Sequence, residues 1–188
     1  MPPKIKISRE DIINTTVELV RAHGEESINT RAIAAALNCS TQPIFSNFDS
    51  VEQLREETIL ASYHIYLKFI SNELETNKYP PYKAFGMAYI RFAKEEKQLF
   101  KLLFMRDRSC EDMSVSPDFN KSVELIMEAN GVSFETASLI HLEMWACVHG
   151  IATMIVTSFF PIECELVSNM LSDIYCGLCK KHLEERKQ

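Results

Sequence analysis

Two groups of residues in this sequence have the types and the spacing to bind another molecule. Residues 40–43 (Ser-Thr-Gln-Pro) place two hydroxyls and one amide at the start of a short predicted helix. Short polar side chains of this kind suit hydrogen bonds to phosphates and to base edges in a DNA groove. Trp145 and His149 stand four residues apart, hence on one face of a helix. They offer an indole N–H and a titratable imidazole to a small molecule.

A third group, Cys176-x-x-Cys179 with His182, has the residue types of a metal or redox site. No second pair stands at zinc spacing, and one helix cannot supply four tetrahedral ligands by itself. We therefore expect reduced core thiols here, as for the other scattered cysteines, and no metal and no cofactor. The sequence contains no nucleophile–base pair and no phosphate loop, so we predict no catalytic residues and no enzyme activity.

The composition is that of an ordinary soluble protein, with 188 residues, 46% hydrophobic and 24% charged. No apolar run follows the first lysines, which predicts a cytoplasmic chain. The net charge of −6 argues against general nucleic-acid binding. Residues 1–50 hold five basic and six acidic side chains. A DNA-binding function must therefore rest on the geometry of a motif.

Long stretches without breakers, with only five glycines and seven prolines, favour helices over strands. The sequence predicts an all-α fold of about nine helices with no strand. The expected N-caps are Ser8, Asn29, Ser40, Ser50 and Ser133, with Gln53 completing a capping box at Ser50. The expected helices run over 9–23, 31–37, 41–48, 51–77, two segments within 85–105, 118–130, 134–159 and 161–184.

Residues 144–160 are apolar enough to raise the alternative of a membrane span. The stretch is only 17 residues long, contains His149 and follows Glu143. A buried core helix is the better interpretation, so we expect no membrane association.

Residues 28–48 form the pattern of a helix-turn-helix. Two short helices flank a tight turn, with Ile33, Leu37, Ile44 and Phe48 directed inward. The first half of the second short helix then projects outward and fits a major groove. A helical hairpin that merely packs remains the alternative. The predicted DNA-binding residues are Asn29, Thr30, Arg31, Ser40, Thr41, Gln42, Pro43, Phe45, Ser46 and Asn47.

Residues 8–54 resemble the DNA-binding region of the tetracycline-repressor (TetR) family. The resemblance rests on Gly24, Ile33-Ala34, Phe45-x-x-Phe48 and Leu54, in the family's order and without gaps. It implies a three-helix DNA-binding domain over 1–50 and a larger helical ligand-binding and dimerisation domain over 51–188. It also implies a homodimeric regulator, in this family most often a repressor. Such a regulator binds a palindromic double-stranded operator and is released from it by a small-molecule effector.

Two positions depart from the family pattern. Phe45 stands where the family usually has tyrosine, and Val51 where it usually has lysine, so two polar groups that face the DNA backbone are absent. Lys4, Lys6, Arg9 and Arg31 are alternative carriers of DNA affinity. A helical dimeric ligand-binding protein that has lost operator binding is the rival interpretation.

The segment Trp145–Gly150 resembles a Trp-x-x-x-His-Gly signature of one TetR subgroup. Methionines and aromatic residues upstream of it can line an adaptable apolar cavity. We predict a mainly apolar effector, although a lone histidine on an apolar face often has a purely structural role. The predicted ligand-binding residues are Met87, Phe92, Phe104, Trp145 and His149.

The last two helices carry broad apolar stripes, which predict dimerisation through them. An intramolecular core is the alternative. The stripes consist of Ile140, Met144, Val148, Ile151 and Ile155, followed by Leu166, Met170, Ile174 and Leu178.

Overall fold

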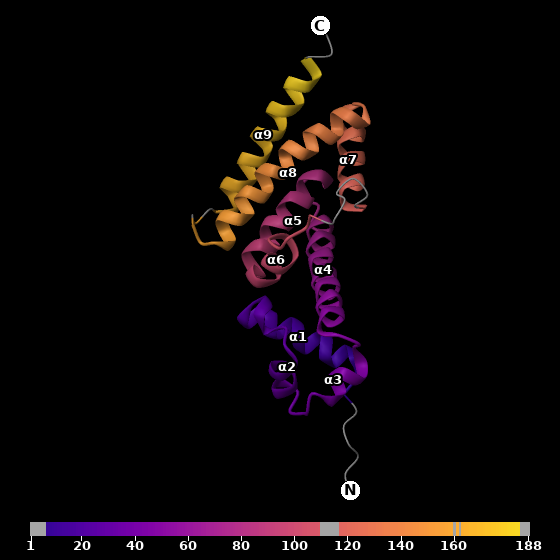
Figure 1. Cartoon of the computed structure of the whole chain (residues 1–188). Helices are drawn as coiled ribbons and strands as arrows, with labels where there is room; N and C mark the ends of the chain where they lie inside the picture. The colour runs from indigo at the N-terminus through magenta and orange to yellow at the C-terminus, as the bar shows by residue number, and fades with distance from the viewer. Residues whose placement is uncertain (1–6, 110–116, 160, 162, 185–188) are drawn as a thin grey trace. The chain divides into compact units, whose positions relative to one another are not determined.

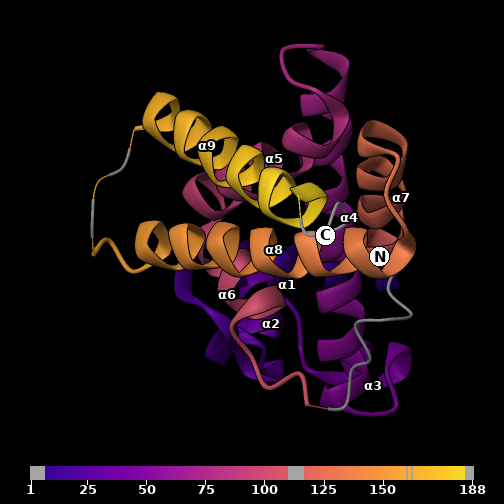
Figure 2. The same ribbon diagram turned by 90° about the horizontal axis from the view of Figure 1, so that it is seen from above.

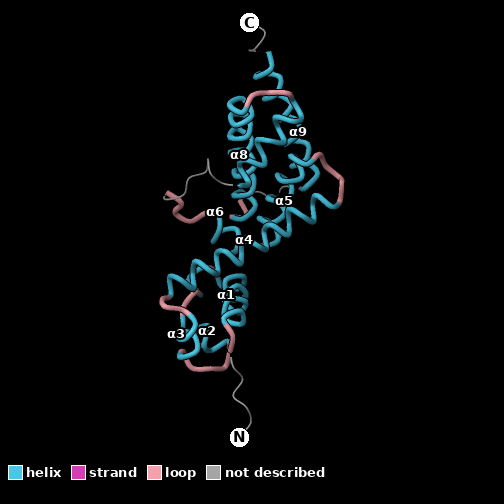
Figure 3. Tube along the Cα trace, turned by 90° about the vertical axis from the view of Figure 1, so that its right-hand side faces the viewer, coloured by secondary structure: helices cyan, strands magenta, loops and turns pink. Residues whose placement is uncertain are grey.

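The computed structural model of the chain describes residues 7–109, 117–159, 161 and 163–184 (Figure 1). These residues form nine α-helices and one short 3-10 helix, and no strand occurs among them (Figure 3). The predicted all-α class is confirmed. The elements are α1 (Arg9–His23), η1 (Glu25–Ser27), α2 (Thr30–Ala36), α3 (Gln42–Asn47), α4 (Val51–Glu75), α5 (Pro81–Glu95), α6 (Lys97–Phe104), α7 (Pro117–Asn130), α8 (Phe134–Val156) and α9 (Cys164–Glu184).

The chain divides into two compact units. The first unit holds residues 1–67 and 96–106, and the second holds residues 68–95 and 107–188. Helix α6 belongs to the first unit because it packs against α1. Its Leu99 and Leu103 are buried. The predicted domain division after residue 50 falls at the start of α4 and remains a prediction.

Local hydrogen bonds explain where several helices begin. The Ser8 hydroxyl accepts from the Asp11 N–H, and the Asp11 carboxylate accepts from the Ser8 N–H, which makes a complete capping box. The Asn29 side chain accepts from the Ala32 N–H at 2.8 Å. The hydroxyl of Ser133 caps α8 in the same way. These starts were predicted from sequence because caps are local.

Helix α3 differs from its prediction. It begins at Gln42, and the N-cap position is Thr41, whose side chain makes no capping hydrogen bond. Ser40 therefore lies before the cap. Pro43 occupies the second helical position, where no intrahelical N–H is required. Helix α9 likewise begins at Cys164, later than Pro161.

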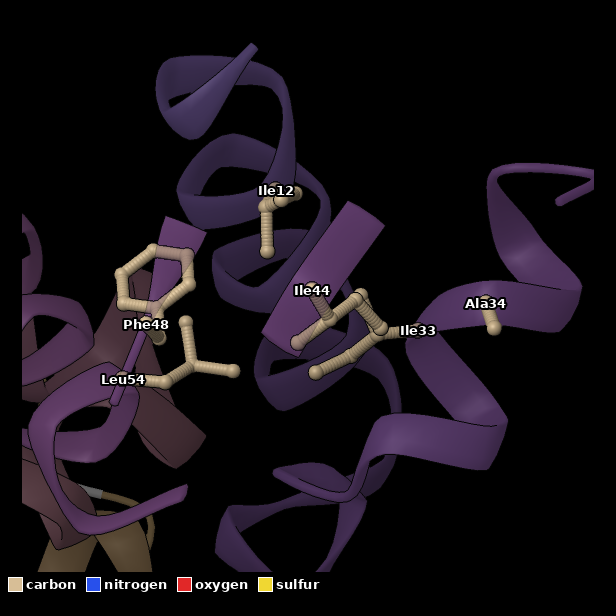
Figure 4. Close-up of a cluster of buried hydrophobic side chains, with 6 residues drawn as sticks. All are labelled: Ile12, Ile33, Ala34, Ile44, Phe48 and Leu54. Carbon is tan, nitrogen blue, oxygen red and sulfur yellow. The ribbon is translucent and has the colours of Figure 1, made fainter. Parts of the chain in front are cut away.

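The first unit has its own hydrophobic core. Ile12 of α1 meets Ile33 of α2, Ile44 of α3 and Leu54 of α4, with Phe48 beside them (Figure 4). All five side chains are at most 2% exposed. The predicted inward direction of Ile33, Ile44 and Phe48 is confirmed, and burial of these side chains fixes how α2 and α3 are presented.

In the second unit, α8 packs against α5, α7 and α9, and Figure 2 shows α8 and α9 beside one another. Ile140, Met144, Val148 and Ile151 of α8 are buried within the chain. Among the described residues α8 is also the one helix long and apolar enough to cross a membrane, and 39% of its most apolar window is buried. A single such helix is weak evidence for a span, because core helices pass the same test.

Candidate nucleic-acid interface and effector site

The structure brings the ten predicted DNA-binding residues onto α2, α3 and the turns that flank these helices. None of them is buried. Gln42, Phe45 and Ser46 are exposed on one side of α3, whereas Ile44 and Phe48 point inward and are each 2% exposed. The spacing of three and four residues between exposed positions is that of one helical face. Helix α3 therefore offers a definite outward face.

Several polar groups of this region are engaged by the protein itself. The Ser46 hydroxyl donates to the carbonyl oxygen of Gln42 at 2.9 Å, and the Asn47 amide donates to that of Pro43 at 2.7 Å. Asn29 is occupied as the N-cap of α2. Gln42, whose amide could pair bidentately with adenine, is accordingly the side chain of α3 best suited to read a base edge.

The two departures from the family pattern both lie on the surface. Phe45 is 59% exposed and Val51 is 41% exposed. Neither ring nor isopropyl group can donate to a phosphate. The surface beside Gln42 is consequently more apolar than a phosphate-binding face usually is.

Three arginines of the first unit are held in ion pairs that join its elements. Arg9 pairs with Glu57 of α4, and Arg21 pairs with Glu96 at 2.8 Å. Arg55 pairs with Glu25 of η1. We expected Arg9 to add to DNA affinity, but its charge is already paired with the carboxylate of Glu57. Lys4 and Lys6, expected to act with it, lie outside the described residues.

In the second unit, Trp145 and His149 stack face to face. Their ring centroids are 5.2 Å apart and the planes lie 13° from parallel. The Oη atom of Tyr89 on α5 lies 2.9 Å from Nδ1 of His149. Burial raises the pKa of Tyr89, so its phenol keeps the proton and can donate to a neutral imidazole. Burial, assisted by the charge of Arg108, lowers the pKa of His149.

Four of the five predicted ligand-binding residues lie in the second unit, and the fifth, Phe104, lies in the first. Met87 and Phe92 lie buried on α5 in the same unit as Trp145 and His149. Phe104 belongs to the first unit, where its ring meets that of Tyr66 edge-on at 5.3 Å. Its place in a common ligand site stays a prediction.

A second aromatic and histidine group was missed by sequence reasoning. The Oη atom of Tyr82 lies 3.0 Å from Nδ1 of His141, and the Phe119 ring meets the imidazole edge-on at 5.1 Å. Burial lowers the pKa of His141 to about 4. No sequence signal identifies this group, because its members come from α5, α7 and α8 and meet only in the fold.

We predicted that the cysteines are core thiols, but not all of them lie in the core. Cys179 is buried, but Cys164 and Cys176 are exposed, and Cys110 lies outside the described residues. His182 does not accompany the cysteine pair: its Nε2 atom lies 3.0 Å from the carboxylate of Glu143. The described part of the chain contains no group of three or more potential metal ligands.

Three leucines of α8 and α9 are open to solvent. Leu139 and Leu142 are 45% and 49% exposed, and Leu166 is 51% exposed. A Cβ atom placed on Gly150 or Gly177 would meet nothing within 4 Å. The exposed stripe of α8 is thus not the predicted one through Ile140 and Ile151, which fills the core of the protomer.

Comparison with known proteins adds to this geometry. Residues 82–171, which run from α5 through α6, α7 and α8 into α9, match the family of tetracyclin repressor-like C-terminal domains. The chain belongs to the tetracycline-repressor family. The predicted membership is therefore confirmed, and the protein is a TetR-family regulator. No protein in the curated set matches the chain.

Proposed function

We propose that this TetR-family regulator is a cytoplasmic homodimer that binds a palindromic double-stranded operator as a repressor and is released by a small-molecule effector. The observation that carries the proposal is the outward face of α3. Gln42, Phe45 and Ser46 are exposed there, while buried Ile44 and Phe48 anchor the helix. A helix presented in this way can enter a major groove. We assign DNA contact to this face and to its neighbours Thr30, Arg31, Ser40, Thr41, Pro43 and Asn47.

Dimerisation is supported by exposed apolar residues of α8 and α9. Leu139, Leu142 and Leu166 are each about half exposed, and exposed leucines on such helices can be covered by a partner helix. Gly150 and Gly177 leave room for the close approach of another backbone. A symmetric dimer would place two recognition helices for half-sites about 34–36 Å apart.

We place the effector at Tyr89, Trp145 and His149, and include Met87 and Phe92, which are buried on α5, the helix that carries Tyr89. The stacked indole and imidazole offer a flat surface, and the Tyr89–His149 pair offers hydrogen-bonding groups. A mainly apolar molecule with a planar part and one polar group fits this chemistry. An effector that releases DNA without changing Trp145 emission, at full potency against His149→Ala, would exclude this position.

A helical ligand-binding dimer without operator binding is the second candidate, and the exposed apolar Phe45 and Val51 favour it. Selection of bound duplexes from a random DNA pool separates the two functions. We expect enrichment of a palindromic sequence, bound with an affinity that falls as salt rises. A pool that stays random through repeated rounds would exclude the repressor proposal and leave the ligand-binding dimer.

A further inference from the structure

Helix α3 is too short to be stable by itself. It has six residues, and the Thr41 side chain at its N-cap makes no hydrogen bond. Isolated helices below about 12–15 residues are marginal in water. The carbonyl groups of its last turn also need donors from outside the helix. Burial of Ile44 and Phe48 fixes one side of α3, but its C-terminal end requires a further attachment.

Arg9, the first residue of α1, supplies that attachment. Its Nη1 group donates to the carbonyl oxygen of Asn47, the last residue of α3. Its Nε and Nη2 groups donate to the two carboxylate oxygens of Glu57 on α4, the Nε contact at 2.9 Å. The guanidinium carbon lies 4.2 Å from the centroid of the Phe48 ring. A single side chain thus joins the start of α1, the end of α3 and the second turn of α4.

Each of these contacts uses a property that arginine has and lysine lacks. The planar fork matches a carboxylate bidentately, and its face stacks on an aromatic ring. Its positive charge is also favourable at the C-terminus of a helix. Three of the five guanidinium N–H groups are directed at protein atoms.

We propose that Arg9 is a positioning residue for DNA recognition. It fixes the position of the recognition helix α3 relative to α4 through its contacts with Asn47 and Glu57. The proposal rests on the DNA-binding function proposed above. Arg9 then acts through Asn47 and Phe48, and its charge is balanced by Glu57 instead of a phosphate. A positioning role and a direct phosphate contact predict different effects of substitutions at Arg9 and Glu57.

The decisive variants are Glu57→Gln and Arg9→Lys, with Glu56→Gln as the matched control. Glu56 is the exposed neighbour of Glu57 on α4. Removing an acidic charge should tighten DNA binding if charge alone mattered. We expect instead that Glu57→Gln weakens binding of the selected duplex about tenfold, while Glu56→Gln leaves it unchanged or tighter. Arg9→Lys should weaken it similarly, because lysine keeps the charge but not the fork.

The salt dependence of binding supplies the readout that distinguishes positioning from phosphate contact. We expect Glu57→Gln and Arg9→Lys to keep the wild-type slope of affinity against salt concentration. Unchanged or tighter binding by Glu57→Gln would overturn the proposal. A loss of about one unit of slope in Arg9→Gln, with Glu57→Gln unaffected, would also overturn it and assign Arg9 to a phosphate.

Hydrogen exchange in the free protein tests the same pair without DNA. We expect faster amide exchange over residues 42–49 in Glu57→Gln and in Arg9→Lys, and wild-type exchange in Glu56→Gln. Unchanged exchange in both variants would overturn the proposal even if the wild-type protein selected no duplex. If no duplex is selected but exchange over residues 42–49 changes as expected, the DNA-binding function is contradicted. The attachment of α3 by Arg9 is then still supported.

Discussion

The indole of Trp145 lies flat against the imidazole of His149, 13° from parallel and with centroids 5.2 Å apart. The chain contains a single tryptophan, so its emission reports on the surroundings of Trp145, which include His149. Tyr89 completes the group from α5 through its hydrogen-bond contact with Nδ1 of His149. We therefore expect the tryptophan emission to depend on the protonation of His149.

We predict that Trp145 emission changes with pH and that His149→Ala abolishes the change. Burial and the charge of Arg108 lower the pKa of His149 from its ordinary value of 6.5. The midpoint of the emission titration should consequently lie below about 6.5. His23→Ala, which removes an exposed histidine of the first unit, is the control. A midpoint at or above the ordinary value would contradict the assignment.

Gln42→Ala should cost about 1–3 kcal/mol of operator binding and relax the preference at one base pair, because it removes a bidentate amide. The side chain is exposed, so the midpoint of thermal unfolding should hardly change. Competition between single-base variants of the selected duplex measures the effect. Equal binding by the variant and wild-type proteins would show that another residue reads this position.

Replacing Leu142 and Leu166 together by glutamate should convert the proposed dimer to monomers and abolish the proposed operator binding. Leu142 of α8 and Leu166 of α9 are each about half exposed. The sequence had pointed to Ile155 and Leu178, which the structure shows half-buried. Sedimentation measures the outcome. Leu60→Glu on α4, where the leucine is 53% exposed, should leave the wild-type sedimentation unchanged.

His141 should make the folded protein less stable at mildly acidic pH. Its pKa is about 4 in the folded state, below the ordinary 6.5 of an unfolded chain. The unfolded state therefore binds the proton first as the pH falls. The contribution of neutral His141 to the free energy of unfolding is fully present above about pH 6.5. It falls between pH 6.5 and pH 4 by roughly 1 kcal/mol per pH unit. Urea unfolding should show this loss in wild type and in His64→Gln, and much less of it in His141→Gln.

Features that depend on neighbouring residues were predictable from the sequence. Ser8, Asn29 and Ser133 were identified as caps because a cap bonds to an N–H two or three residues further on. The inward direction of Ile33 and Ile44 followed from helical spacing. Helix caps and the inward direction of side chains both depend on residues within one or two turns of the same helix.

Features that join distant segments were not predictable. Arg9 and Glu57 are 48 residues apart, and Tyr89 and His149 are 60 apart. Nothing local distinguishes these side chains from other surface arginines or buried tyrosines. The same limit explains the error in the α8 stripe: periodicity identifies an apolar face, but not whether the chain itself or a partner covers it.

The ion pairs of the first unit bear on how such a protein finds one site among many. Arg9, Arg21 and Arg55 are each matched by a glutamate of the same unit. Positive charge that is neutralised internally does not attract arbitrary phosphates, and non-specific binding is mostly electrostatic. Under the proposed operator-binding function, competing sequences on a chromosome would therefore capture few molecules. A small number of copies per cell could then keep one operator occupied.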